Sequence, residues 1–217
     1  MAKYFGGRGA DLLRGGKWTD LLKGYNGNDR IYGGAGNNTL DGGDGHDRLH
    51  GGDGNDRLIG GTGRDRIWAN RGNDTVDAGS GHDIVFGGQG DDSIDGGTGA
   101  DNLEGGAGND AVLGGAGIDL LFGGDGNDLL NGGAGSDLLR GGQGQDTFAF
   151  NAAGFGRDRI RDFSQADDLI DLRGSGITAF EQLKIAIKGN ATVVDTGTGT
   201  IVLNNFKGTL AADDFVL

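Results

Sequence analysis

The stretch Gly51-Gly52-Asp53-Gly54-Asn55-Asp56-Arg57-Leu58-Ile59 shows the pattern on which this chain is built, G-G-x-G-x-D-x-U-x, where U is a large apolar residue. Sixteen such nine-residue units follow one another without insertion or deletion from residue 6 to residue 149. Self-similarity at a fixed period is typical of solenoids, in which each unit stacks on its neighbours. The units make up about two thirds of the 217 residues, so fold and function are both expected to depend on them.

The eighth position of the unit is apolar in all sixteen copies, from Leu13 to Phe148. One apolar residue in nine is too few for the apolar face of a helix, but it suffices for a short strand whose middle side chain points inward. Glycine prevails at the first, second and fourth positions and suits the tight turn between such strands, because it adopts positive φ. A disordered glycine-rich linker has no reason to keep the apolar position.

The sixth position carries a carboxylate in every unit except the one with Asn38. Equivalent residues of stacked turns lie about 4.8 Å apart, where carboxylates repel one another unless a cation lies between them. Oxygen-only ligands on a flexible turn suit Ca²⁺, whereas zinc prefers Cys or His, and the chain has no Cys. We therefore predict calcium ligands at Asp11, Asp20, Asp29, Asp47, Asp56, Asp65, Asp74, Asp83, Asp92, Asp101, Asp110, Asp119, Asp128, Asp137 and Asp146.

Composition and motifs argue against several other classes of protein. The net charge is −13, no apolar run approaches the length of a membrane span, and Met1–Phe5 leads into the repeats without a signal peptide. The sequence contains no H-E-x-x-H, no G-x-S-x-G and no phosphate-binding loop. We therefore expect no catalytic residues, no organic cofactor, no membrane span and no nucleic-acid partner.

Two rows of side chains stand out on the outward positions of the odd-numbered units. The ninth positions place Tyr32, His50, Trp68 and Phe86 in one row, and the seventh positions place Arg30, Arg48 and Arg66 beside it. One interpretation is that the rings stabilise the stack of strands. The other is that the two rows form a ligand face for glycans or polyanions, through ring stacking and guanidinium forks.

The pattern changes after Phe148, which divides the chain into a lead-in (1–5), the repeats (6–149) and a C-terminal capping region (150–217). In this region we predict short strands at 158–163 and 168–172, a short helix over 178–185 and a hairpin of 191–195 with 200–203. Such a β-rich piece would cover the open end of a solenoid.

The nonapeptides resemble the RTX family, the hemolysin-type calcium-binding repeats of secreted bacterial proteins. The resemblance implies an all-β fold, a right-handed parallel β-roll with two nonapeptides per coil and a small C-terminal cap. It also implies Ca²⁺ between neighbouring coils, held by Asp carboxylates and turn carbonyls, with roughly ten or more ions in all.

The C-terminal region is similar to the serralysin-like end of many RTX proteins, in its two D-x-I motifs and in its acidic-then-apolar terminus Asp213–Leu217. This resemblance implies a type I secretion exporter as partner and an extracellular location, in a Gram-negative bacterium.

Three functional hypotheses follow. The first is a structural and binding module that folds when it meets extracellular Ca²⁺ after export. The second is a truncated secretion domain of an RTX enzyme, such as a protease, a lipase or an alginate-modifying enzyme. The third is an adhesin or matrix protein that binds extracellular polysaccharide or a cell surface through the aromatic–Arg face.

Overall fold

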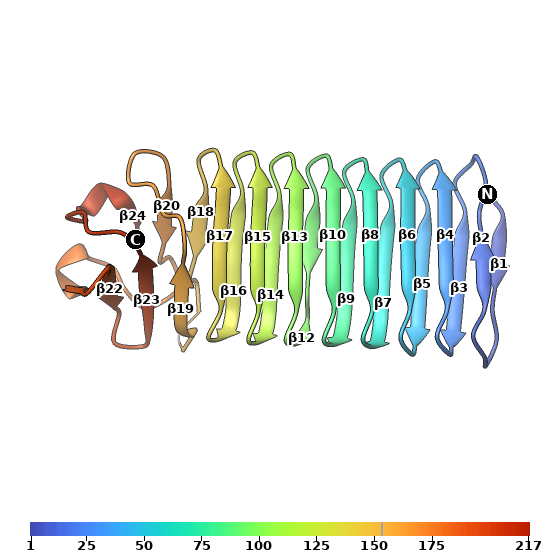
Figure 1. Ribbon diagram of the computed structural model, residues 1–217, viewed down its shortest axis with the longest axis horizontal. Coiled ribbons are helices and arrows are strands. Elements are labelled where there is room, and N and C mark those ends of the chain that lie inside the picture. The colour runs from blue at the N-terminus through green and yellow to red at the C-terminus, as the bar shows by residue number, and fades with distance from the viewer. Residues whose placement is uncertain (153) are drawn as a thin grey trace.

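The chain winds into a β-solenoid of about nine turns, with two parallel stacks of strands along its length (Figure 1). The computed structural model describes residues 1–152 and 154–217, and within them the helical structure amounts to two 3₁₀ turns. The fold is therefore the all-β parallel roll that the repeats predict. No helix of the described residues is long and apolar enough to span a membrane.

The odd-numbered units contribute their strands to one stack and the even-numbered units contribute theirs to the other. The odd stack contains β2 (Leu12–Arg14), β4 (Arg30–Ala35), β6 (Arg48–Asp53), β8 (Arg66–Arg71), β10 (Ile84–Gln89), β13 (Asn102–Ala107), β15 (Leu120–Asp125), β17 (Leu138–Gln143), β19 (Gly156–Ile160) and β23 (Gly199–Asn204). The even stack contains β1 (Lys3–Phe5), β3 (Leu21–Asn26), β5 (Thr39–Asp44), β7 (Arg57–Gly63), β9 (Thr75–Gly81), β11 (Ser93–Asp95), β12 (Thr98–Gly99), β14 (Ala111–Gly117), β16 (Leu129–Gly135), β18 (Thr147–Ala149), β20 (Leu169–Asp171) and β24 (Phe215–Val216).

The register confirms that two nonapeptides make one coil. Arg48 of β6 pairs with Arg30 of β4 on one side and with Arg66 of β8 on the other, so partners are 18 residues apart. Every position of the unit therefore recurs in a straight row along the solenoid, one residue per coil.

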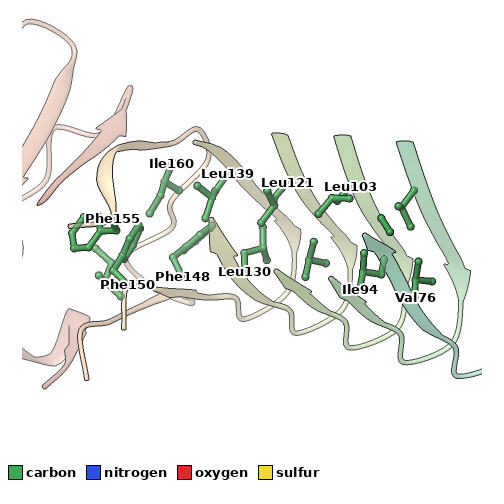
Figure 2. Packing of buried hydrophobic residues seen from close by; sticks show 14 of the residues in the cluster. Val76, Ile94, Leu103, Leu121, Leu130, Leu139, Phe148, Phe150, Phe155 and Ile160 are labelled. Carbon is green, nitrogen blue, oxygen red and sulfur yellow. The ribbon is translucent and has the colours of Figure 1, made fainter. Parts of the chain in front are cut away.

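The core is a thin double row of the eighth-position side chains, one row from each stack (Figure 2). Each of these residues from Leu22 to Phe148 is at most 2 % exposed. Full burial of such a side chain contributes about 1.5–3 kcal/mol, so the rows supply the apolar part of the stability. Phe150 and Phe155 lie beside Phe148 at the C-terminal end of the rows (Figure 2).

The turns require glycine because successive coils touch backbone to backbone. Gly81, at the fourth position of its unit, has φ +146°, and a Cβ on it would run into the carbonyl oxygen of Gly63 in the preceding coil. Gly9 holds the same position in the first unit, where no coil precedes it, and the place of its Cβ has no atom within 4 Å.

This contrast yields a matched pair of substitutions. We expect Gly81→Ala to lower the free energy of unfolding of the calcium-loaded protein by about 3 kcal/mol or more, because backbone strain and overpacking each cost about 1–3 kcal/mol. Gly9→Ala should change it by less than about 1 kcal/mol. Urea unfolding followed by circular dichroism measures both, and equal midpoints for the two variants would contradict the backbone contact.

Both strand stacks continue past the last nonapeptide into the C-terminal region. β17 pairs with β19, which pairs with β23, and β18 pairs with β20, which pairs with β24. The two predicted strands and the hairpin of β22 (Ala191–Asp195) with β23 are confirmed. The boundary at residue 149 stays a prediction, because the nonapeptide pattern ends there while the pairing of strands does not.

The helix predicted over 178–185 is wrong. Phe180–Gln182 forms a single 3₁₀ turn, and β21 (Lys184–Lys188) follows it and pairs with β22. Gln182 Oε1 accepts the backbone N–H of Ala179 at 3.1 Å. The other half of a capping box is absent, because Ala179 at the N-cap has no side-chain oxygen to accept the backbone N–H of Gln182. The alternation of Lys and apolar residues in 184–188 has the period of a strand. The second 3₁₀ turn is Ala212–Asp214.

Candidate metal centres

The sixth-position Asp residues form two ladders, one in each row of turns between the strand stacks. Each backbone N–H donates to Oδ1 of the equivalent residue one coil further on, as Asp47 does to Asp65 at 2.8 Å and Asp65 to Asp83 at 2.7 Å. The rungs all measure between 2.6 and 3.0 Å. All fifteen predicted Asp residues lie in these two ladders.

The second carboxylate oxygen has no protein partner along most of the two ladders. Oδ2 is buried and accepts no hydrogen bond in thirteen residues. They are Asp29, Asp47, Asp56, Asp65, Asp74, Asp83, Asp92, Asp101, Asp110, Asp119, Asp128, Asp137 and Asp158. A buried acceptor left unsatisfied costs about 1–3 kcal/mol, and more when it is charged. Thirteen such atoms in regular rows indicate a missing partner that recurs with the repeat.

Glycine at the first position leaves a small space beside ten of these oxygens. A methyl group placed on Gly51 would lie 2.5 Å from Oδ2 of Asp56 and 2.6 Å from the carbonyl oxygen of Ala69 in the next coil. The space is thus lined by a carboxylate oxygen from one coil and a carbonyl oxygen from the next. Ala69 and Ala78 place a methyl group there in two units, which makes those two spaces narrower.

Asn38 shows what kind of group the space accepts. Its Oδ1 keeps the ladder bond, accepting the backbone N–H of Asp20 at 2.9 Å. Its Nδ2 takes the place that Oδ2 has elsewhere and donates to the carbonyl oxygen of Gly36 at 2.6 Å. In this unit an N–H group of the protein itself supplies the positive partner. Where Oδ2 stands at that place without a hydrogen bond, the partner must come from outside the protein.

Burial opposes ionisation of the ladder carboxylates. Desolvation raises the pKa of Asp65, Asp74 and Asp92 to about 7 and that of Asp158 to about 8, although each accepts a backbone N–H that lowers it. At neutral pH the ionised ladders therefore destabilise the fold unless cations bind to them.

The donor set fits a hard divalent cation. Within residues 1–152 and 154–217, no three His, Cys, Asp or Glu side chains gather at one point. A site can therefore draw on the carboxylates of neighbouring rungs and on turn carbonyls, all of them oxygen. Ca²⁺ accepts many oxygen ligands in flexible geometry, whereas Mg²⁺ demands a near-ideal octahedron. The residues present thus fit Ca²⁺.

Sequence reasoning missed two members of the ladders. Asp158 and Asp168 accept the backbone N–H groups of Asp137 and Asp146, at 2.8 and 3.0 Å. They escape an 18-residue period because the spacing is 21 and 22 residues at these rungs. The signal that could have found them is the D-x-I triplet, which repeats positions six to eight of the nonapeptide.

The ends of the ladders differ from the middle. Oδ2 of Asp11 accepts the N–H of Gly7 at 2.7 Å, and Oδ2 of Asp20 accepts that of Gly16 at 2.9 Å. At the other end, Oδ2 of Asp168 accepts the N–H of Ser164 at 2.8 Å. Backbone donors satisfy these three carboxylates, so they have less need of a cation than the thirteen whose Oδ2 is unpaired.

The rings on the odd face stack on one another. Ring centroids are 4.8 Å apart for Tyr32 and His50 and 4.5 Å for His50 and Trp68, with the planes within 3° of parallel. Phe86 follows at 6.1 Å from Trp68, and the guanidinium of Arg14 lies 4.9 Å from the Tyr32 centroid at the other end. The faces of the inner rings are therefore occupied, and these rings offer their edges to solvent.

Comparisons with known proteins agree with this geometry. The family model of the RTX calcium-binding nonapeptide repeat (4 copies) matches residues 4–17, 19–49, 50–85, 77–112, 86–121 and 113–148. No curated protein matches the sequence.

Solved structures that match the chain include two subunits of a mannuronan C5-epimerase from Azotobacter vinelandii. One is 32 % identical over 59 % of this chain and 78 % of its own, with a TM-score of 0.41. The other is 27 % identical over 58 % and 88 %, with a TM-score of 0.36. The extracellular lipase LipA from Serratia marcescens is 20 % identical over 99 % of this chain and 40 % of its own, with a TM-score of 0.38. With the family model covering most of the sequence, the chain belongs to the RTX calcium-binding nonapeptide repeat proteins.

Proposed function

We propose that this chain is a structural and binding module that is unfolded at low calcium and folds on meeting extracellular Ca²⁺ after type I export. The observation that carries the proposal is the row of thirteen buried carboxylate oxygens without a hydrogen-bond partner. A fold that buries this many anionic atoms needs a cation as part of its structure.

Calcium binding is coupled to folding because only the folded state has the binding sites. The oxygens of one space come from residues in successive coils, such as Asp56 and Ala69, and they are adjacent only when the coils are stacked. A ligand that binds the folded state alone stabilises it by RT ln(1 + [L]/Kd), so calcium concentration sets the folded fraction. When bound, Ca²⁺ would supply the positive charge that offsets the repulsion between rungs.

The ligands of this proposal are the predicted Asp residues with unpaired Oδ2, joined by Asp158. If each pair of neighbouring rungs holds an ion, the count reaches roughly ten or more. About seven divalent ions would already outweigh the net charge of −13. The calcium-loaded surface would then be near neutral or basic, despite the acidic composition.

The C-terminal region supports the export part of the proposal. It continues the strand stacks and ends in the acidic-then-apolar segment Asp213–Leu217, in which Phe215 and Val216 form β24. By family resemblance we assign this end to recognition by a type I exporter of a Gram-negative bacterium. A secretion domain belonging to a larger RTX enzyme would use the same calcium chemistry, and the native sequence preceding the repeats distinguishes the two possibilities.

A calcium titration followed by far-ultraviolet circular dichroism tests the proposal. At pH 7.5 in chelator we expect the spectrum of an unfolded chain, and millimolar Ca²⁺ should produce a cooperative change to β structure. Mg²⁺ at the same concentration should fail to do so, because its octahedral preference does not suit carbonyl-rich turns. A β-rich spectrum in chelator at this pH would refute calcium-coupled folding.

A further inference from the structure

The row of Arg30, Arg48 and Arg66 lacks the counter-charges that a purely structural role would predict. The three residues are direct partners on adjacent strands, their side chains are exposed, and none of them has an ion pair among the described residues. Like charges directly opposite one another destabilise a sheet. A basic row at the strand spacing of about 4.8 Å, on a chain of net charge −13, is therefore a feature that packing does not explain.

A basic cavity of about 240 Å³ lies at one end of this row. Arg64 and Arg66 line it together with His46 and His82, and Asp65 and Ile84 complete the wall. Since Asp65 turns its Oδ1 to the backbone N–H of Asp47, that oxygen belongs to the ladder. The four basic side chains thus make the cavity a site for a negatively charged group.

The two imidazoles in the cavity are oriented as donors. His46 Nδ1 accepts the backbone N–H of Arg64 at 2.8 Å, and His82 Nδ1 accepts that of Ala100 at 2.7 Å. With Nδ1 used as an acceptor, the neutral ring carries its proton on Nε2, which is free to donate. Two imidazoles with Nε2–H donors and two Arg side chains therefore line one cavity. Carboxylate and sulfate oxygens are the acceptors that guanidinium forks bind in bidentate fashion.

The ring ladder beside the Arg row narrows the choice of ligand. Proteins that bind single-stranded nucleic acid stack bases on aromatic faces, and the faces of His50 and its neighbours are already taken by one another. The surface left for a ligand is a straight row of ring edges, with one guanidinium group per coil beside it. A polymer that lies flat and presents an anionic group at each step fits this surface.

We propose that the odd face binds a linear polysaccharide with one anionic group on each sugar unit, aligned with the solenoid axis and anchored in the basic cavity. The coil spacing of about 4.8 Å is close to the length of one pyranose unit in an extended chain, so the charges of the polymer recur in register with the Arg row. The proposal concerns the folded molecule and thus rests on the calcium-loaded state, but it adds a ligand class to that state.

The test uses the full chain in millimolar Ca²⁺ and measures binding by calorimetry. The probes are a galacturonate hexamer with a carboxylate on every unit, a sulfated maltohexaose, a hyaluronan hexamer with a carboxylate on every second unit, and neutral maltohexaose. We expect the first two to bind, with their ratio identifying the preferred anion. The hyaluronan hexamer should bind about tenfold more weakly or worse, and maltohexaose should not bind.

Two triple variants distinguish the effect of the Arg row on binding from the effect of the total charge of the protein. Arg30→Gln/Arg48→Gln/Arg66→Gln should lose about tenfold or more of the affinity for the galacturonate hexamer. Arg8→Gln/Arg57→Gln/Arg157→Gln removes the same charge from exposed positions outside the row and should stay within about twofold. Both variants must show the circular dichroism spectrum of the parent in Ca²⁺, so a failure of folding is distinguishable from a failure of binding.

Three results would overturn the proposal: no binding of either charged hexamer by the folded protein, equal losses in the two triple variants, or tighter binding of a single-stranded oligonucleotide than of the charged hexamers.

Discussion

Acidification is expected to fold the calcium-free chain. Between about pH 7.5 and pH 5 its β content should rise, which is the reverse of ordinary acid unfolding. Burial raises the pKa of Asp47, Asp56 and Asp110 to about 6 and that of Asp65 and Asp74 to about 7, against the value of 3.8 for an exposed Asp in an unfolded chain. Within this window the folded state therefore holds more protons than the unfolded state does.

The sign follows from proton linkage. A folded pKa above the unfolded one means that the free energy of unfolding falls as pH rises through the window and recovers as pH falls. For Asp65, raised from 3.8 to about 7, the penalty at neutral pH is about 4 kcal/mol. A few such penalties equal the whole stability of an ordinary domain, about 5–15 kcal/mol. The ladders must therefore carry either protons or cations for the fold to persist.

Circular dichroism of the calcium-depleted protein, recorded as a function of pH, measures this effect. A parallel series in millimolar Ca²⁺ is the control. There the fold should already be complete at pH 7.5, and less calcium should suffice for folding as the pH falls, because protons stabilise the same buried carboxylates. A calcium-free chain whose β content stays constant or falls from pH 7.5 to pH 5 would contradict the buried-carboxylate account.

Replacing ladder carboxylates by amides should change stability in opposite directions with and without calcium. Asp56→Asn/Asp74→Asn/Asp92→Asn extends the ladder position of Asn38 along its own edge of the solenoid. Each amide can accept the rung bond through Oδ1 and donate through Nδ2, as Asn38 does. Because the pKa values of the three carboxyls are raised to about 6, 7 and 7, each substitution removes a penalty of about 3–4 kcal/mol at neutral pH without calcium.

We expect this triple variant to fold at lower calcium than the parent, to bind fewer ions at saturation and to gain less stability from them. Calorimetry gives the number of ions, and thermal unfolding at several calcium concentrations gives the stability. The charge-matched control Asp53→Asn/Asp77→Asn/Asp91→Asn changes exposed carboxylates and should leave the number of ions unaltered. The reverse change, Asn38→Asp, should raise the calcium requirement. A triple variant that binds as many ions as the parent would show that the unpaired oxygens are not the ligands, and one that needs more calcium to fold would contradict the penalty assigned to their burial.

The repeat predicts the solenoid well because each position of the unit has one physical task. Leu58 and its equivalents had to point inward because only the eighth position is apolar in every unit, and the Asp row had to stack once the strands did. The prediction weakens where spacing changes. Asp158 and Asp168 keep their rungs although three and four extra residues loop out before them, and a fixed period cannot find them.

Other features depend on atoms that a sequence pattern does not fix. The capping-box spacing suggested a helix near Phe180, but the N-cap is Ala179, which cannot accept a hydrogen bond through its side chain. The cavity of His46 and His82 arises because two turn positions, 36 residues apart, flank Arg64 on one edge. Neither the absence of a helix near Phe180 nor the cavity follows from composition or period. Both depend on how the residues are placed in three dimensions.

The rungs of both ladders point the same way. Beginning with the N–H of Ala2, each donor lies in one coil and its carboxylate acceptor in the coil closer to the C-terminus, until Asp158 and Asp168 receive the last bonds. A coil thus finds its acceptors in place only if the coil after it has formed. The C-terminal region, whose buried Val194, Ile201 and Phe215 continue the core of the repeats, can supply the first acceptors. We therefore expect the ladders to be completed from the C-terminal end toward the N-terminus, one coil at a time.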